Sequence, residues 1–210
     1  LGSATLLMPP LAENKAIAEI QLMIDAGYRA DEHTISVAAQ LTNNSFILSR
    51  KTRLTGGAVM QAWLGGEHEG DFVLSAGGYH PDFIVPPHYP AVPRIGFNLN
   101  YSNSLTFKGE LYFALVASSV MTGGTLEVSW ASGDLSAWLI VNLNVIVGWK
   151  PVQYQADSYV TVGASYTFEE FGFRKTLTYE VGANLHLFGP DLSGNIYVDL
   201  HVISFNIAFG

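Results

Sequence analysis

Apolar and polar residues alternate with a period of two over most of the chain. Between residues 175 and 187, every second residue from Leu177 to Leu187 is apolar, and the residues between them are polar or glycine. Similar apolar rows occupy alternate positions in residues 135–147 and 160–168. Alternation of this kind places the two classes of side chain on opposite faces of a strand. The pattern therefore predicts long antiparallel strands with one wet face and one dry face.

Shorter strands are predicted in the first part of the chain, where Asn-Asn and Gly-Gly pairs indicate turns. They cover residues 34–40, 46–53, 58–64 and 72–76. Residues 14–26 fit a capped helix as well as a strand, and we prefer the strand because the surrounding sequence is strand-like.

The last segment of the chain changes its pattern within a single apolar stretch. Its apolar residues occupy even positions up to Val202 and odd positions from Ile203 onward. A shift of one residue in the alternation is what an extra residue in one strand produces. We therefore expect a β-bulge near Val202.

Prolines crowd into a short segment near the middle of the chain, at positions 81, 86, 87, 90 and 93. Proline has no backbone N–H, so this segment cannot supply a regular ladder of hydrogen bonds. Tyr79, Phe83 and Tyr89 nevertheless give it aromatic surface to bury. We expect an ordered crossover between two β regions.

These patterns predict an all-β fold. Long antiparallel strands in a meander form a sandwich or barrel-like sheet with a proline-rich crossover. The N-terminal short-strand region covers residues 1–78, the crossover covers 79–93, and the long-strand antiparallel region covers 94–210. We expect the three regions to form one continuous domain, since 210 residues suffice for a single substantial domain.

Composition and charge exclude several classes of protein. The chain is 49% hydrophobic and 13% charged, whereas disordered chains have low hydrophobicity and high charge. It contains no cysteine, which excludes a disulfide framework and a thiolate zinc site. Its formal net charge of -8 disfavours nucleic acid as a partner. No apolar run reaches the roughly 18–20 residues of a membrane-spanning helix.

Three blocks of sequence are similar to a known family: residues 70–81, residues 112–115 with 120–124, and residues 137–138 with 148–151, Tyr154 and Ala156. Over residues 54–210 the chain resembles the C-terminal region of an uncharacterised β-rich family found in very large bacterial and fungal proteins. The resemblance implies that the chain is part of a large protein. It implies no functional residues, because no activity is established for that family.

The proline-rich crossover carries the candidate binding residues, which are Tyr79, His80, Asp82, His88 and Tyr89. Imidazoles beside aromatic rings could bind a metal ion or line a cleft for a carbohydrate or peptide. They could equally anchor an irregular segment through hydrogen bonds of buried ring nitrogens. Binding residues are often found on irregular loops held by a rigid sheet.

A weaker group of metal-ligand candidates lies at a glycine-flanked tip and consists of Glu67, His68, Glu69 and, just after Gly70, Asp71. Carboxylate and imidazole groups suit a divalent cation. The flanking glycines, however, predict a solvated hairpin tip. We therefore expect no metal and no cofactor.

Catalytic motifs do not emerge from the sequence. It contains no serine nucleophile elbow, phosphate-binding loop or dinucleotide fingerprint, so we expect no enzyme. The favoured interpretation is a structural or interaction module of a larger protein, with a self-assembly or adhesion-like role. Its partners would be other copies of itself or neighbouring domains, in an extracellular or cell-surface setting. A groove for lipid or another apolar ligand and an outer-membrane-type β-barrel are the alternatives.

Overall fold

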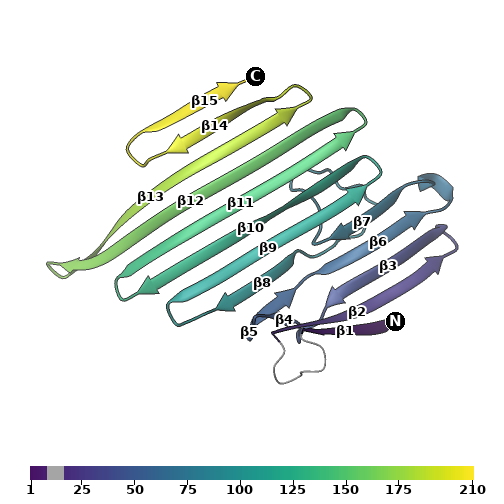
Figure 1. Ribbon diagram of the computed structural model, residues 1–210, viewed down its shortest axis with the longest axis horizontal. Coiled ribbons are helices and arrows are strands. Elements are labelled where there is room, and N and C mark those ends of the chain that lie inside the picture. The colour runs from purple at the N-terminus through teal and green to yellow at the C-terminus, as the bar shows by residue number, and fades with distance from the viewer. Residues whose placement is uncertain (9–16) are drawn as a thin grey trace.

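The computed structural model describes residues 1–8 and 17–210, which form one fifteen-stranded antiparallel sheet (Figure 1). The prediction of an all-β antiparallel fold is confirmed. One short 3-10 helix, η1 (Gly66–His68), interrupts the strands. The strands are β1 (Gly2–Met8), β2 (Ala18–Arg29), β3 (Thr34–Leu41), β4 (Phe46–Ile47), β5 (Ser49–Thr55), β6 (Gly57–Trp63), β7 (Phe72–Ala76), β8 (Ile95–Asn100), β9 (Leu105–Val116), β10 (Ser119–Ser132), β11 (Leu135–Trp149), β12 (Val152–Glu170), β13 (Phe173–Gly189), β14 (Ser193–Asp199) and β15 (Ser204–Phe209).

The C-terminal half of the sheet is a meander in which each strand from β9 to β14 pairs with the next one in the chain. The N-terminal half is more complex. Between β2 and β9 the sheet divides into two stacks, β3–β6–β7 and β4–β5–β8, which lie end to end along both β2 and β9. The two stacks and the strands that join them close a ring of hydrogen-bonded strands. The proline-rich segment leads from β7 in one stack to β8 in the other.

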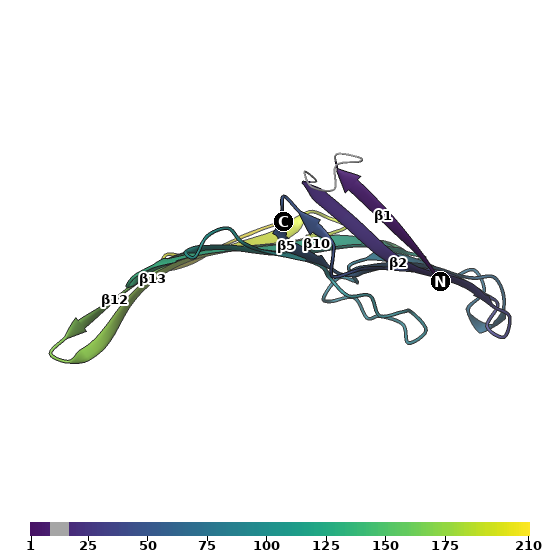
Figure 2. The same cartoon turned by 90° about the horizontal axis from the view of Figure 1, so that it is seen from below.

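The sheet is a single layer, and the proline-rich segment between β7 and β8 lies on one of its faces (Figure 2). β1 and β2 rise toward the opposite side. The hydrophobic core lies between this segment and the sheet, and its buried residues are Trp63, Val73, Tyr79, Tyr112, Ala114, Val116 and Met121. Phe83 and Tyr89 pack against this cluster. The expected burial of the aromatic residues in the crossover is therefore observed.

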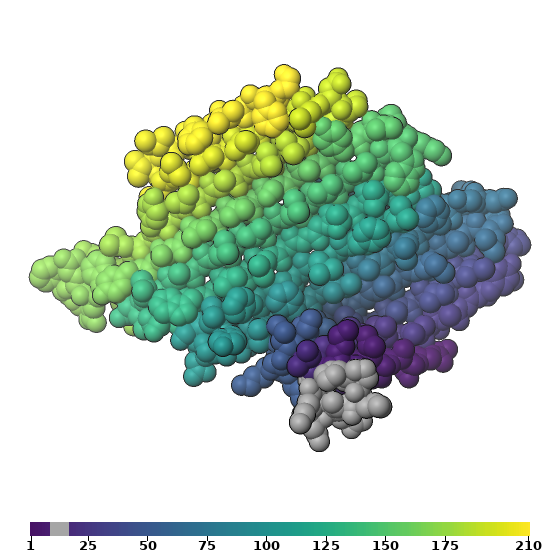
Figure 3. All heavy atoms as spheres, in the orientation of Figure 1, coloured from purple at the N-terminus to yellow at the C-terminus, as the bar shows by residue number. Residues whose placement is uncertain are grey.

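Beyond the proline-rich segment and the core beneath it, the two faces of the sheet differ sharply in polarity. Residues paired across antiparallel strands point to the same face, so the register assigns each side chain to one side. The polar face holds the proline-rich segment and the side chains of Tyr112, Asn144 and Asp157. The apolar face lies opposite, and its side chains include Leu111 (50% exposed), Leu126 (38%), Leu143 (49%), Val162 (52%) and Leu177 (65%). In the described residues no second layer covers it. Figure 3 shows one broad face of the sheet, with the strands of the C-terminal half side by side in chain order from teal to yellow.

Two details of the predicted strands can be compared with the structure. The strand preferred for residues 14–26 is confirmed from Ala18 onward, while residues 14–16 lie outside the described residues. The bulge expected near Val202 is wrong, because residues 200–203 form a turn between β14 and β15, with the Leu200 amide bonded to the Ile203 carbonyl at 3.0 Å. The register of this hairpin pairs Val198 with Phe205, so even and odd positions exchange faces across the turn.

Among the described residues, no helix has the length and apolar character needed to cross a membrane.

Candidate functional site

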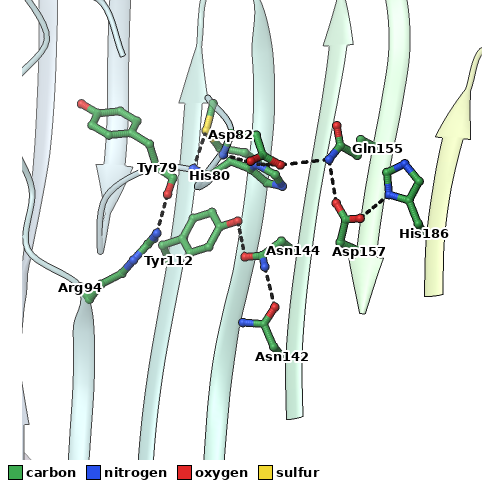
Figure 4. Close-up of polar contacts among 11 residues, drawn as sticks. Tyr79, His80, Asp82, Arg94, Tyr112, Asn142, Asn144, Gln155, Asp157 and His186 are labelled. Carbon is green, nitrogen blue, oxygen red and sulfur yellow. Dashed lines mark hydrogen bonds and ion pairs between the residues drawn. The ribbon is translucent and has the colours of Figure 1, made fainter. Parts of the chain in front are cut away.

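Arg94 fastens the proline-rich segment to the polar face (Figure 4). Its guanidinium group donates one hydrogen bond to the Gly77 carbonyl at 3.0 Å and another to the Tyr79 carbonyl at 2.7 Å. The same group lies 4.0 Å from the centre of the Tyr112 ring, in a cation–π contact. One side chain thus joins the start of the segment to β9.

Tyr79 anchors the segment to itself. Its hydroxyl donates to the Pro90 carbonyl at 2.9 Å, and the residue as a whole is 9% exposed. Burial raises the pKa of Tyr79 to about 12, so the hydroxyl keeps its proton and its role as donor at neutral pH. The next residue, His80, donates its backbone N–H to Met121 Sδ at 3.2 Å.

A row of polar side chains crosses the sheet beside this anchor. The register places Tyr112, Asn144, Asp157 and His186 side by side on β9, β11, β12 and β13. Tyr112 reaches over β10 and donates to Asn144 Oδ1 at 2.9 Å. Gly123 makes this reach possible, because a Cβ there would lie 2.8 Å from the Tyr112 ring. The row brings polar groups from distant parts of the sequence to one position.

His80 and two carboxylates meet at this row. The ligand atoms of His80, Asp82 and Asp157 all lie within 4.8 Å of one another. The Gln155 side-chain amide donates to Asp82 Oδ2 at 3.1 Å and to Asp157 Oδ2 at 2.8 Å, while the ring of His186 bonds to Asp157 Oδ1. The cluster therefore has the donor set of a divalent cation site.

Burial lowers the pKa of His80, and the positive charge of Arg94 acts in the same direction. The negative charges of Asp82 and Asp157 oppose this effect without cancelling it. The His80 ring is therefore uncharged at neutral pH, which is the form that binds metal ions.

A cavity of about 370 Å³ adjoins the cluster, between the proline-rich segment and the ends of β10–β13. Asp82 and Gln155 line it on the side of the cluster, and Lys150 and Phe188 also contribute to its wall. Ser119 lines it as well, and its buried hydroxyl has no hydrogen-bond partner in the described part of the chain. The volume is that of a small-molecule site.

Asp71 organises a second cluster at the other end of the segment. It accepts hydrogen bonds from His88 Nε2 at 2.9 Å, from the Tyr89 hydroxyl at 2.7 Å and from the Phe72 amide at 2.9 Å. The ring of His68 stacks on His88 with a centroid distance of 3.7 Å. Burial tends to raise the pKa of Asp71, but the donated hydrogen bonds outweigh it and hold the pKa below the ordinary 3.8.

Replacing Asp71 with asparagine is expected to lower the free energy of unfolding by about 1–2 kcal/mol at neutral pH, because three donors lose a charged acceptor. The folded-state pKa is depressed, so the contribution of the carboxylate is complete above the ordinary value and is lost as the pH falls through the folded-state pKa. The difference in the free energy of unfolding between wild type and variant should therefore shrink as the pH falls below the ordinary value of 3.8. Urea unfolding across this range at fixed chain concentration measures it.

The exposed Asp31 provides the control, since Asp31→Asn should change the free energy of unfolding by less than about 0.5 kcal/mol at any pH. An Asp71→Asn effect that is equal at neutral and acidic pH would contradict the assigned charge interaction.

The residues singled out from the sequence divide between the two clusters. His80 and Asp82 join Asp157, while His88 and Tyr89 join Asp71 and His68. Tyr79 is buried between them and packs near both Phe83 and Tyr89. Glu67 and Glu69 are exposed at the tip around η1.

Four residues of the site were not expected from the sequence: Arg94, Gln155, Asp157 and His186. The alternation of polar and apolar residues does place three of them, Gln155, Asp157 and His186, on the wet face of the long strands. Asp157 and His186 become neighbours only through the register of β12 with β13. Periodicity assigns a face but does not supply that register.

A sequence model of a protein family matches residues 1–210, and the family is described as a family of unknown function, DUF6603. The chain belongs to this family. The match extends the family likeness, expected for residues 54–210, to the whole DUF6603 chain. No curated protein and no solved structure matches the DUF6603 chain.

Proposed function

We propose that this chain is a non-enzymatic interaction module that self-associates by packing its apolar face against the apolar face of a second copy. The observation that carries the proposal is a single-layer sheet whose apolar side is uncovered in the described residues. Large contiguous apolar patches are rare on soluble proteins and mark interaction surfaces. Membership of a larger protein stays a prediction from the sequence.

The size of the apolar face supports a stable interface. The strands β9–β13 are 12 to 19 residues long. At about 3.3 Å per residue and about 4.8 Å between strands, these five strands alone present roughly 1,000 Å². A standard protein–protein interface buries about 800 Å² per partner. The apolar face of one chain therefore offers a second copy more area than one partner buries in a standard interface.

The distribution of charge permits two copies to meet on this side. On β9–β13, charged residues of the apolar face occur near the β12–β13 hairpin, where Glu170 and Lys175 form an ion pair with each other. Charged groups such as Glu127, Asp157 and Glu180 belong to the polar face. The net charge of -8 therefore opposes face-to-face packing only weakly.

The shape of the face favours a second sheet over a small apolar ligand. Ligand pockets enclose about 70–90% of a bound molecule, whereas one layer covers a ligand from one side only. Aromatic rings also occupy the space above glycines on neighbouring strands, Phe97 at Gly109 and Tyr154 at Gly189. The resulting level surface suits the aligned packing of two sheets at a spacing of about 10 Å.

Charged residues in the centre of the apolar face are expected to prevent self-association. Leu126 and Leu143 are both more than one-third exposed in the single chain, so the double variant Leu126→Glu/Leu143→Glu should retain its fold. Burial of two unpaired carboxylates in an interface should weaken association by at least about a hundredfold. Sedimentation equilibrium of wild type and variant without detergent, with circular dichroism to verify the fold, measures this.

The matched control is Ser129→Glu, which adds a carboxylate at an exposed position of β10 on the polar face. It should associate like the wild type. A wild type that is monomeric at high concentration would overturn the proposal, as would association that the double variant leaves unchanged. Stoichiometric lipid found by mass spectrometry on a monomeric chain would overturn it in favour of the lipid alternative.

A further inference from the structure

A buried histidine nitrogen on the polar face lacks a partner. The His80 side chain is 1% exposed, and its Nε2 atom has no hydrogen-bond partner in the described part of the chain. Buried polar atoms are hydrogen bonded in the great majority of cases, so each exception requires an explanation. The other ring nitrogen is occupied, because Nδ1 accepts the Asp82 backbone N–H at 3.1 Å.

Two carboxylates stand beside this ring. Asp82 and Asp157 offer oxygens within 4.8 Å of each other and of the His80 ligand atom. The amide of Gln155 donates to both of them and holds the two negative groups together. Figure 4 shows the His80 ring lying next to Asp82 and directed toward the strand that carries Gln155 and Asp157.

We propose that His80, Asp82 and Asp157 bind one divalent transition-metal ion of the Zn²⁺ or Mn²⁺ class. One imidazole nitrogen and two carboxylate oxygens form a donor set that such ions accept. Ca²⁺ is a poorer match, because it takes six to eight oxygen ligands. The site lies away from the apolar face, so a negative result for metal binding would leave the self-association proposal unaffected, and the reverse also holds.

The three side chains need only a small adjustment to share an ion. Ligand atoms bound at about 2.1 Å lie at most about 4.2 Å apart, so the group must contract by several tenths of an ångström. Asp82 can supply this movement, since it is 67% exposed on the proline-rich segment. Asp157 is held in place from behind by the ring of His186, in the manner of an outer-shell partner.

The protons can be accounted for. The amide bond to Nδ1 places the proton of the neutral His80 ring on Nε2. When Nε2 binds the ion, this proton moves to Nδ1, so the hydrogen bond from the Asp82 backbone N–H is lost and the backbone at Asp82 must turn away from the ring. The new Nδ1–H can then donate to the Asp82 carboxylate, whose Oδ2 lies 4.0 Å from Nδ1.

Titration of the purified chain with Zn²⁺ and with Mn²⁺ by isothermal calorimetry, in excess Mg²⁺ at about pH 7.5, tests the proposal. We expect one ion per chain for at least one of the two metals. Asp82→Asn and Asp157→Asn should each weaken binding by at least about tenfold. Because Asp82 is exposed, Asp82→Asn should fold normally and give an interpretable result even if substitution of the buried His80 does not.

His88→Gln is the matched control, because this second histidine of the segment bonds to Asp71 and lies outside the cluster. It should bind the ion as the wild type does, and Zn²⁺ or Mn²⁺ should raise its thermal midpoint as in the wild type. No saturable binding would overturn the proposal. Equal affinity in the wild type, Asp82→Asn and Asp157→Asn would also overturn it, as would a loss confined to His88→Gln.

Discussion

Replacing Arg94 with alanine is expected to lower the free energy of unfolding by about 3–5 kcal/mol. Its guanidinium donates to the carbonyls of Gly77 and Tyr79 and lies over the Tyr112 ring. Each hydrogen bond from a charged donor contributes about 1.5–3 kcal/mol, and the cation–π contact adds about 0.5–2 kcal/mol. Without Arg94 both carbonyls lose their donor beneath a segment that has no strand hydrogen bonds of its own.

Urea unfolding at fixed chain concentration measures this loss, with tyrosine and tryptophan fluorescence as the signal. Arg94→Lys should fall between wild type and alanine, since a lysine keeps the charge but lacks the planar fork that reaches two carbonyls. The exposed Arg174 in β13 supplies the control, and Arg174→Ala should cost less than about 0.5 kcal/mol. If Arg94→Ala cost no more than that control, the anchoring role of Arg94 would be wrong.

Gly77→Ala is expected to be comparably damaging, at about 3 kcal/mol or more. Gly77 has a φ of 81°, a conformation that costs other residues about 1–2 kcal/mol. A Cβ at this position would also collide with the Leu111 carbonyl and approach the backbone of Ile95. Both obstacles are backbone atoms of strands in the sheet, so neither can move without breaking hydrogen bonds.

The variant Gly70→Ala distinguishes the cost of the backbone conformation from the cost of the steric collision. The φ of Gly70 is 84°, close to that of Gly77, but a Cβ there would meet nothing within 4 Å. Gly70→Ala should therefore cost only the conformational term of about 1–2 kcal/mol. The free energies of unfolding of the two variants, measured by thermal and urea unfolding, should differ by about 2 kcal/mol. Equal costs would show that the close approach of the segment to β9 is not rigid.

The alternation of side chains was sufficient to predict most of the strands. Leu135–Trp149 and Phe173–Gly189 contain the predicted segments and extend them by a few residues. The reason is physical, because a strand with one wet and one dry face repeats every two residues. Residues 46–53 were less clear, and the structure divides them between β4 and β5, with Leu48 at a positive φ of 63° between them.

The candidate site could be predicted only in part. His80 and Asp82 stand out because they occupy an irregular segment rich in aromatic residues. Asp157 lies 75 positions after Asp82 in an ordinary polar row of β12. It comes near the segment because β9, β10, β11 and β12 pair in this order. Which strands become neighbours across the ring between β2 and β9 is likewise not encoded in local pattern. Long-range pairing therefore limited the prediction.

The C-terminal meander has a further consequence for how the domain is built and folds. Each strand from β10 to β14 pairs with the strand before it and the strand after it in the chain, so this half behaves as a nearly one-dimensional array. Such an array can gain or lose a hairpin at its end without altering the register of the rest. An added or missing hairpin at the β15 end would therefore change the width of the sheet without disturbing the ring or the proline-rich segment that covers part of it.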